Sequence, residues 1–156
     1  MNIRIEYLAD HESNLAKVAE WQHAQFGYLN PSVTIAQRTN RLRESLQRDR
    51  LPMALVAVSE HGALVGSASI LKTTLTHEHL TPWLSSVFVP NALRRKGIAT
   101  ALSLRAIDEA LRIGFERLYL FTPHSESLYT RLGWQTFERT NHNGLPIAIM
   151  ARPTRT

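Results

Sequence analysis

A short run of basic and small residues is the part of this sequence that most clearly predicts a chemistry. An apolar segment, Val87 to Val89, leads through Pro90 to Arg94-Arg95-Lys96-Gly97-Ile98-Ala99, after which apolar residues recur with helical spacing. The first turn of a helix has backbone N–H groups without partners and partial positive charge from its aligned peptide dipoles. Gly97 has no Cβ, so the backbone there can come close to a ligand. The run therefore predicts an anion-binding site suited to a diphosphate.

A second segment contains a residue able to donate a proton. Ser127-Leu128-Tyr129-Thr130-Arg131-Leu132-Gly133-Trp134 follows the strand-like run Arg117 to Phe121. A phenol stays protonated near neutral pH, so Tyr129 can supply a proton or a hydrogen bond to a departing anion. For an isolated helical tyrosine, the alternative is a ring packed beneath a sheet with its hydroxyl in water.

The two segments together resemble the motifs of one family. Arg94-x-x-Gly97-x-Ala99, after the strand Trp83 to Val89, resembles the acyl-CoA-binding signature of the GNAT acetyltransferase superfamily, Arg/Gln-x-x-Gly-x-Gly/Ala. Leu128-Tyr129-Thr130-Arg131-Leu132-Gly133-Trp134 is similar to the family's Leu-Tyr-x-x-x-Gly-Phe/Trp ending. Because both motifs occur in the family's order and spacing, the sequence is identified as a member.

The resemblance extends over the whole chain and implies an α/β fold. It implies a mixed central sheet of about seven strands with about four helices, in the order β-α-α-β-β-β-α-β-α-β-β. The strand, helix and strand around the anion-binding run predict a parallel pair with a right-handed crossover. Periodicity and turn residues predict these elements: a strand from Ile3, a helix from His11 to about Gln25, a helix capped by Ser32 or Thr34 and reaching about Arg48, a hairpin of Met53 to Ser59 and Ala63 to Leu71, a polar loop from Thr73 to Pro82, a strand from Trp83 to Val89, a helix from Ile98 to Ile113, a strand from Arg117 to Phe121, a short helix ending at Gly133, and a hairpin of Gln135 to Arg139 and Leu145 to Ala151.

The resemblance also implies a reaction and the residues that serve it. The acetyl group of acetyl-CoA, the donor cosubstrate, would pass directly to a primary amine of an unidentified acceptor, and the absence of Cys agrees with a reaction that has no thioester intermediate on the enzyme. Tyr129 would supply the proton for the departing thiolate, and a backbone N–H of the strand would meet the oxyanion. The backbone of Val87, Phe88 and Val89 would pair with the pantetheine arm, and Arg94 would shape the loop that follows. The diphosphate would accept hydrogen bonds from the backbone N–H groups of Arg95, Lys96, Gly97, Ile98, Ala99 and Thr100.

Several features of the site stay open at this point. The general base is His77, Glu78 or His79 in the loop before the strand, a serine of the strand, or a water relay. The His-x-His spacing lacks a third ligand, so no metal is predicted. Where many family members have an Asn that contacts pantetheine, this chain has Thr122-Pro123-His124-Ser125. An acyl donor longer than acetyl also stays open.

The acceptor pocket is expected in the segments that vary most among proteins of this fold. The segments concerned are Trp21 to Asn30, Thr73 to Pro82 and Asn141 to Gly144. Trp21 and Phe26 could line a pocket, but aromatic residues at helical spacing more often belong to a core. None of these segments identifies an acceptor.

Composition limits the other classes of function. A chain of 156 residues with 44% hydrophobic residues is long enough to bury one core, so we expect a single GNAT domain over residues 1–156. Met1 to Glu6 carries charges where the apolar part of a signal peptide would lie, and no segment is apolar enough to span a membrane. We therefore expect a cytoplasmic protein without a membrane partner.

The net charge of +5 raises a nucleic-acid-binding alternative. The arginines between Arg38 and Arg50 are spread along a predicted helix with Glu44 and Asp49, which is typical of a solvated face, so no nucleic-acid partner is expected. A non-catalytic acyl-CoA sensor or interaction module is the other alternative, and the presence of Tyr129 argues against it. The resemblance allows a homodimer, which the sequence itself does not show.

Overall fold

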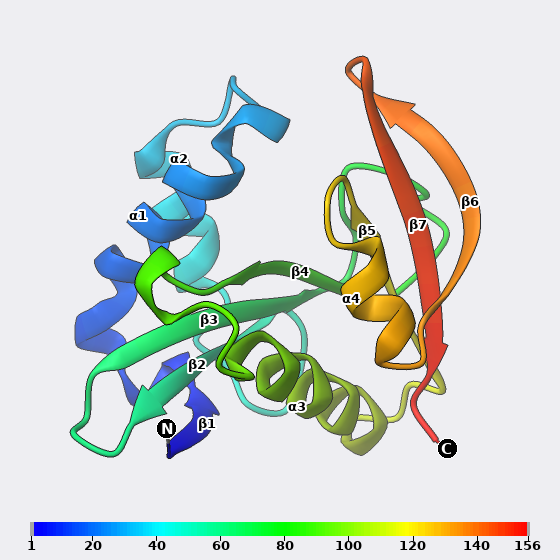
Figure 1. Cartoon of the computed structure of the whole chain (residues 1–156). Coiled ribbons are helices and arrows are strands. Elements are labelled where there is room, and N and C mark those ends of the chain that lie inside the picture. The colour runs from blue at the N-terminus through cyan, green and yellow to red at the C-terminus, as the bar shows by residue number, and fades with distance from the viewer. Residues whose placement is uncertain (1, 156) are drawn as a thin grey trace.

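One seven-stranded sheet runs through the computed structural model, which describes residues 2–155 (Figure 1). The strand order is β1-β2-β3-β4-β5-β7-β6. All neighbouring strands are antiparallel except β4 and β5, which are parallel, as predicted. The strands are β1 (Ile3–Tyr7), β2 (Met53–Ser59), β3 (Leu64–Leu71), β4 (Trp83–Phe88), β5 (Arg117–Thr122), β6 (Gln135–His142) and β7 (Leu145–Pro153).

Helices cover both faces of the sheet. On one face lie α1 (Leu15–Phe26) and α2 (Ile35–Arg43), and on the other lie α3 (Ile98–Arg112) and α4 (Glu126–Arg131). β2 shows why both faces must be covered: Leu55 and Ala57 pack with the α3 cluster, whereas Val56 and Val58 pack with α1. Successive side chains of a strand point to opposite faces, so an uninterrupted apolar strand needs a layer on each side. The fold class and the order of elements are therefore as predicted.

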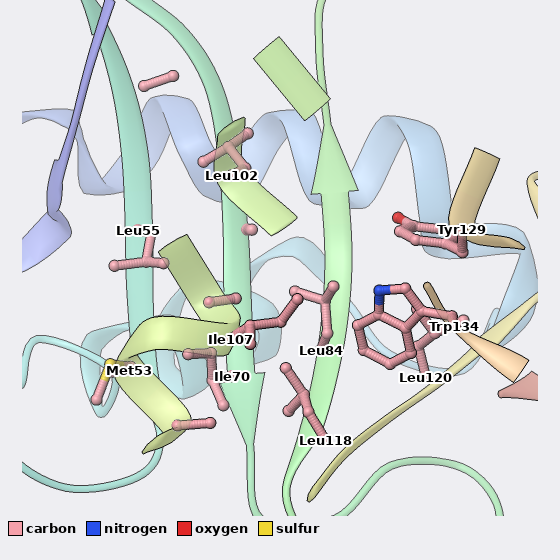
Figure 2. Close-up of a cluster of buried hydrophobic side chains, with 14 of the residues drawn as sticks. Met53, Leu55, Ile70, Leu84, Leu102, Ile107, Leu118, Leu120, Tyr129 and Trp134 are labelled. Atoms are coloured by element: carbon pink, nitrogen blue, oxygen red, sulfur yellow. The ribbon is translucent and has the colours of Figure 1, made fainter. Parts of the chain in front are cut away.

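The core beneath α3 also contains two side chains from the region of α4. Figure 2 shows Leu84, Leu118 and Leu120 beside Tyr129 and Trp134. Trp134 is 1% exposed, and its ring centroid lies 5.9 Å from that of Tyr129. α4 is thus fixed to the sheet by its own aromatic residue and by the one that follows it.

The first predicted helix begins later than expected. Residues Leu8–Asp10 and Glu12–Asn14 form separate 3-10 turns, and α1 starts at Leu15 instead of His11. His11 has φ −137° and ψ 43°, which is not helical, and its imidazole Nε2 lies 2.7 Å from Glu6 Oε1. The ring contact with β1 therefore keeps this residue out of the helix.

The second predicted helix begins as expected and ends early. The Thr34 hydroxyl accepts from the Gln37 N–H at 3.1 Å, and the Gln37 side chain accepts from the Thr34 N–H at 2.9 Å, which is a capping box. α2 ends at Arg43 instead of Arg48, because the carbonyl of buried Ser45 accepts from the Ala54 N–H at 3.2 Å. That bond to β2 turns the chain out of the helix.

The remaining elements agree with the prediction apart from the last hairpin, which is longer. β6 and β7 pair as far as His142 and Leu145. Asn143 and Gly144 have positive φ values of 50° and 81°, as a tight hairpin turn requires, so the strands need no wider loop. None of the helices within residues 2–155 has the length and apolarity needed to cross a membrane.

Gly66 provides a test of the packing between β3 and α3. A Cβ at this position would lie 3.0 Å from Ile98 Cγ2 and 3.1 Å from the Phe88 carbonyl oxygen. We expect Gly66→Ala to lower the free energy of unfolding by about 1–3 kcal/mol through overpacking. The control Gly27→Ala, whose Cβ would meet only the His23 ring at 3.7 Å, should change it by less than about 1 kcal/mol. Equal stability of the two variants in denaturant titrations would contradict this packing.

Candidate active site

The site is built on a separation of two adjacent strands. β4 and β5 are in register at a single pair, Trp83 with Tyr119. Beyond that pair β4 follows β3, with a bulge at which Ser69 pairs with Ser85 and Ser67 with Phe88. Ser86 within the bulge has a positive φ of 55°, a conformation that costs energy for a residue with a side chain. The β4 backbone at the bulge and beyond therefore has no partner on the β5 side.

A cleft of about 1130 Å³ occupies this gap. Its walls come from α1 and α2, from β3, β4 and β5, from the first turn of α3, and from α4. In Figure 1 the gap lies between α1 and α2 on one side and α4 on the other, with β4 beneath it. Because the sheet is open here, the cleft connects its two faces.

The beginning of α3 has the geometry of an anion site. Arg95 and Gly97 have positive φ values of 65° and 83°, and Gly97 caps the helix without any side-chain hydrogen bond. The first N–H bonded within the helix is that of Ala101, which donates to the Gly97 carbonyl at 3.0 Å, so the preceding N–H groups are free for a ligand. A Cβ on Gly97 would meet nothing within 4 Å, so the protein itself requires glycine for its φ and leaves the space open. These residues fit a diphosphate.

Arg94 is bonded to the backbone of its own loop. Its Nε donates to the Val89 carbonyl at 3.0 Å, across the 3-10 turn Asn91–Leu93. The bond joins the end of β4 to the start of the anion-binding run, Arg94 to Ala99.

The structure places all but one of the predicted cofactor residues on the cleft wall, and Lys96 is the exception. The predicted residues that line the cleft are Val87, Phe88, Val89, Arg94, Arg95, Gly97, Ile98, Ala99 and Thr100.

Tyr129 also lines the cleft, from α4. It is 7% exposed, and Figure 2 shows its hydroxyl on the side nearer β4. Burial raises the pKa of the Tyr129 phenol to about 12, and the neighbouring Ser103 hydroxyl offsets part of that increase. The phenol is therefore neutral throughout the physiological range and has one proton to donate.

The turn before α4 is held by the side chain of a threonine. The Thr122 hydroxyl accepts from the Ser125 N–H at 2.9 Å and from the His124 N–H at 3.3 Å. Thr122 is buried, and all three residues line the cleft. Thr122 thus holds the turn that presents Tyr129.

The histidine loop lies away from the cleft. His77 Nε2 is 2.8 Å from Glu138 Oε1, and the His77 ring packs near Trp83 and Phe137. Neither His77, Glu78 nor His79 is among the lining residues, whereas Ser85 and Ser86 are, with their hydroxyls 3.3 Å apart. Aromatic packing and the contact of His77 with Glu138 of β6 hold the loop over the end of the sheet.

Gln22, within the segment Trp21 to Asn30 expected at the acceptor pocket, and Arg38 are polar residues of the cleft that the sequence analysis did not single out. Gln22 is 5% exposed, and its amide donates to the Ser69 hydroxyl at 3.3 Å. Its position four residues after Val18 puts a polar side chain on the apolar face of α1, a signal that was available in the sequence. Arg38 lines the cleft from α2, and this follows only from the way in which that helix packs in the fold.

The aromatic residues of the segment Trp21 to Asn30 have different places. Phe26 and Tyr28 line the cleft, whereas the Trp21 ring packs 5.1 Å from the ring of Phe88.

Comparisons with known proteins agree on a family and a fold. The model of the Acetyltransferase (GNAT) family matches residues 15–134. The uncharacterized N-acetyltransferase YjgM of Escherichia coli K12 is 33% identical over 82 residues, and the match covers 50% of this chain and 48% of that relative. The match thus spans about half the length of that relative.

Two solved structures are similar over nearly the whole chain. An aminoglycoside 6′-N-acetyltransferase complexed with coenzyme A has a TM-score of 0.78 at 17% identity, and 100% of this chain and 98% of that one are covered. A spermidine N-acetyltransferase SpeG chimera from Vibrio cholerae and hSSAT has a TM-score of 0.74 at 14% identity, with 99% and 96% covered. At these identities the likeness is one of fold.

The raised pKa of Tyr129 can be measured directly. Ultraviolet titration of tyrosinate, as the difference between the wild type and Tyr129→Phe, should show that Tyr129 ionises well above the value of about 10 of a tyrosine in a model peptide. The pKa of Tyr129 is higher in the folded than in the unfolded protein. The neutral phenol therefore contributes to the free energy of unfolding below about pH 10, and this contribution is lost as the pH rises toward the folded pKa. A Tyr129 midpoint near that of a free tyrosine, in protein still folded by circular dichroism, would contradict the burial of the hydroxyl.

Proposed function

The chain belongs to the GNAT family of acetyltransferases, and from this premise we propose that it transfers the acetyl group of acetyl-CoA directly to a primary amine. One observation supports this most strongly: the unpaired edge of β4, the free N–H groups of α3 and the Tyr129 hydroxyl all face one cleft. An acyl-CoA held in this cleft would have its diphosphate at the N–H groups of α3, its pantetheine amides at the edge of β4 and its sulfur at the Tyr129 hydroxyl.

Backbone groups provide most of the cofactor site in this proposal. The β4 backbone at Val87 to Val89 pairs with the pantetheine amides as a further strand would, since β5 leaves that edge free. The N–H groups at the start of α3 bind the diphosphate, and the exposed Arg95 adds positive charge. The cofactor supplies an activated acetyl thioester.

The reaction requires help at three atoms. The amine nitrogen attacks the thioester carbon, a C–N bond forms, and the C–S bond breaks. A backbone N–H of the β4 bulge stabilises the oxyanion, and Tyr129 gives its proton to the departing thiolate. The proton lost by the amine leaves through water next to Ser85 and Ser86, because the histidine loop lies outside the cleft. A phenol of raised pKa stays protonated until the C–S bond lengthens and negative charge develops on sulfur.

Gly97 and Gly114 form a matched pair for testing cofactor binding. They flank α3, with φ values of 83° and 101°, and a Cβ on either would meet nothing within 4 Å. Gly97→Ala and Gly114→Ala should each cost about 1–2 kcal/mol in the free protein, from left-handed backbone strain. Acetyl-CoA at a hundred times its Kd should stabilise the wild type and Gly114→Ala by about 2.7 kcal/mol.

The same ligand concentration should leave Gly97→Ala with little or no stabilisation, because the new methyl group enters the space left for the diphosphate. Thermal unfolding with and without acetyl-CoA measures this. Equal ligand-induced shifts in the two variants would place the diphosphate elsewhere.

Tyr129→Phe tests the role of the hydroxyl. We expect kcat to fall by about 10²- to 10⁴-fold, with the Kd for acetyl-CoA nearly unchanged, since only proton donation is lost. Tyr119→Phe is the control, because Tyr119 packs against Trp83 and Phe137 and is not part of the cleft wall. Thiol release in the presence of an accepted amine gives kcat. Full turnover by Tyr129→Phe would remove the proposed role and favour water as the donor.

A further inference from the structure

Arg38 is an arginine on the cleft wall without a partner. Its Nε is fully buried and unbonded, and within residues 2–155 its guanidinium makes neither a side-chain hydrogen bond nor an ion pair. Burial, and then the charge of Arg41, lower the pKa of Arg38. A buried donor without an acceptor destabilises a protein, so an arginine in this state suggests that something binds it.

Several other arginines of the protein have a side-chain partner. Arg43, on the same helix, donates to the Asn40 side chain at 2.7 Å. Arg105 pairs with Glu109 at 3.1 Å, and Arg139 pairs with Glu126 at 2.6 Å. What distinguishes Arg38 is burial, because its Nε is the only arginine nitrogen of residues 2–155 that is both buried and unbonded.

Arg38 lies on the face of the sheet opposite the start of α3. It lies one turn before Leu42, which is 4% exposed and packs with α1 and β2. Ile98 at the start of α3 and Tyr129 belong to the core on the other face. The anion at α3 and the guanidinium of Arg38 thus approach the open gap from different faces. A ligand of Arg38 enters from the side of α1, where Gln22 bonds Ser69.

The charge of this side of the cleft is positive. Arg38, Arg41 and Lys72 line it, and Glu44 is the only carboxylate of the cleft wall among the described residues. Phe26, Tyr28 and Leu75 add apolar surface. A polyamine would be repelled by this wall, whereas a molecule with an anionic group would satisfy the unbonded donor.

We propose that the acceptor is an amine that carries an anionic group near its nitrogen, a carboxylate as in an amino acid, and that Arg38 binds this group. The inference rests on the transferase function proposed above and specifies its substrate class. Arg38 fixes the carboxylate, so that the amine of the same molecule points through the gap toward the β4 bulge. A phosphonate offers the same chemistry to a guanidinium and is the other source of such an anion.

The test compares acceptors that differ only in this charge. The panel contains free amino acids, the corresponding amides, aminoalkylphosphonates and spermidine, with acetyl-CoA at fixed concentration and thiol release as the readout. The wild type should prefer free acids to amides by about ten-fold or more in kcat/KM. The comparison with phosphonates shows which anion fits better, and preference for either over the amides supports the proposal.

Variants of α2 then assign that preference to one side chain. Arg38→Gln should lower kcat/KM for the acids by about 10- to 100-fold, since a charge-assisted hydrogen bond to the carboxylate is lost. The kcat/KM for the amides should stay within about two-fold of the wild-type value. Arg38→Lys should recover part of the loss. The control Arg43→Gln removes the same charge from the same helix outside the cleft wall and should behave as the wild type. The KM for acetyl-CoA should not change in any of them.

Arg38→Gln should also fold at least as stably as the wild type, because a buried unbonded donor is removed. Thermal stabilisation by the same acids, present in the wild type and lost in Arg38→Gln, is a readout that needs no turnover.

Several results would overturn this inference. They are preference for amides or spermidine, equal losses for acids and amides in Arg38→Gln, a raised KM for acetyl-CoA alone, or neither turnover nor stabilisation with any anionic amine. Efficient transfer to spermidine would leave the proposed transferase function standing. Failure of that function would show separately, as absence of stabilisation of the wild type by acetyl-CoA.

Discussion

The separation of β4 from β5 is the constraint on which the rest of the structure depends. Each strand is held by its other neighbour: β5 pairs with β7 from Arg117 to Thr122, and β4 pairs with β3. Trp83, fully buried and bonded through Nε1 to the Leu80 carbonyl at 2.7 Å, fixes the point where the two strands still touch. Beyond it, the bulge at Ser86 directs β4 along β3. Because each strand keeps one partner, the sheet can open here while backbone groups stay free for a ligand.

The opening also explains why chemically different groups converge. α3 begins where β4 ends, so its free N–H groups lie at one end of the gap, and α4 follows β5, so Tyr129 lies on the other wall. The α1 and α2 layer covers the opposite face and lines the cleft from that side. Two ligands could therefore approach the same point from the two faces of one sheet, as the proposed direct transfer requires.

Local signals in the sequence predicted most elements and the anion loop. The capping residues of α2, the strand periodicity and the run from Arg94 to Ala99 each depend on a few neighbouring residues. The main boundary error comes from a contact between distant segments, because the bond between Ser45 and Ala54 ended α2 early. The sequence left the general base open, and the contact of His77 with Glu138 holds that loop outside the cleft wall. Arg38 lacked any local signal, because its place on the wall depends on how α2 packs against α1. The loop before α3 was thus more predictable from the sequence than the α2 wall of the cleft.

Amide hydrogen exchange with and without coenzyme A reports on the individual backbone N–H groups that a ligand in the gap would bind. Exchange should become slower at Val87 to Val89 and at Ile98 to Thr100 when coenzyme A is bound, and stay unchanged along β1 and β6 at the sheet edges. Unchanged exchange at the β4 edge and at the start of α3 under saturating coenzyme A would contradict a cofactor bound in the gap.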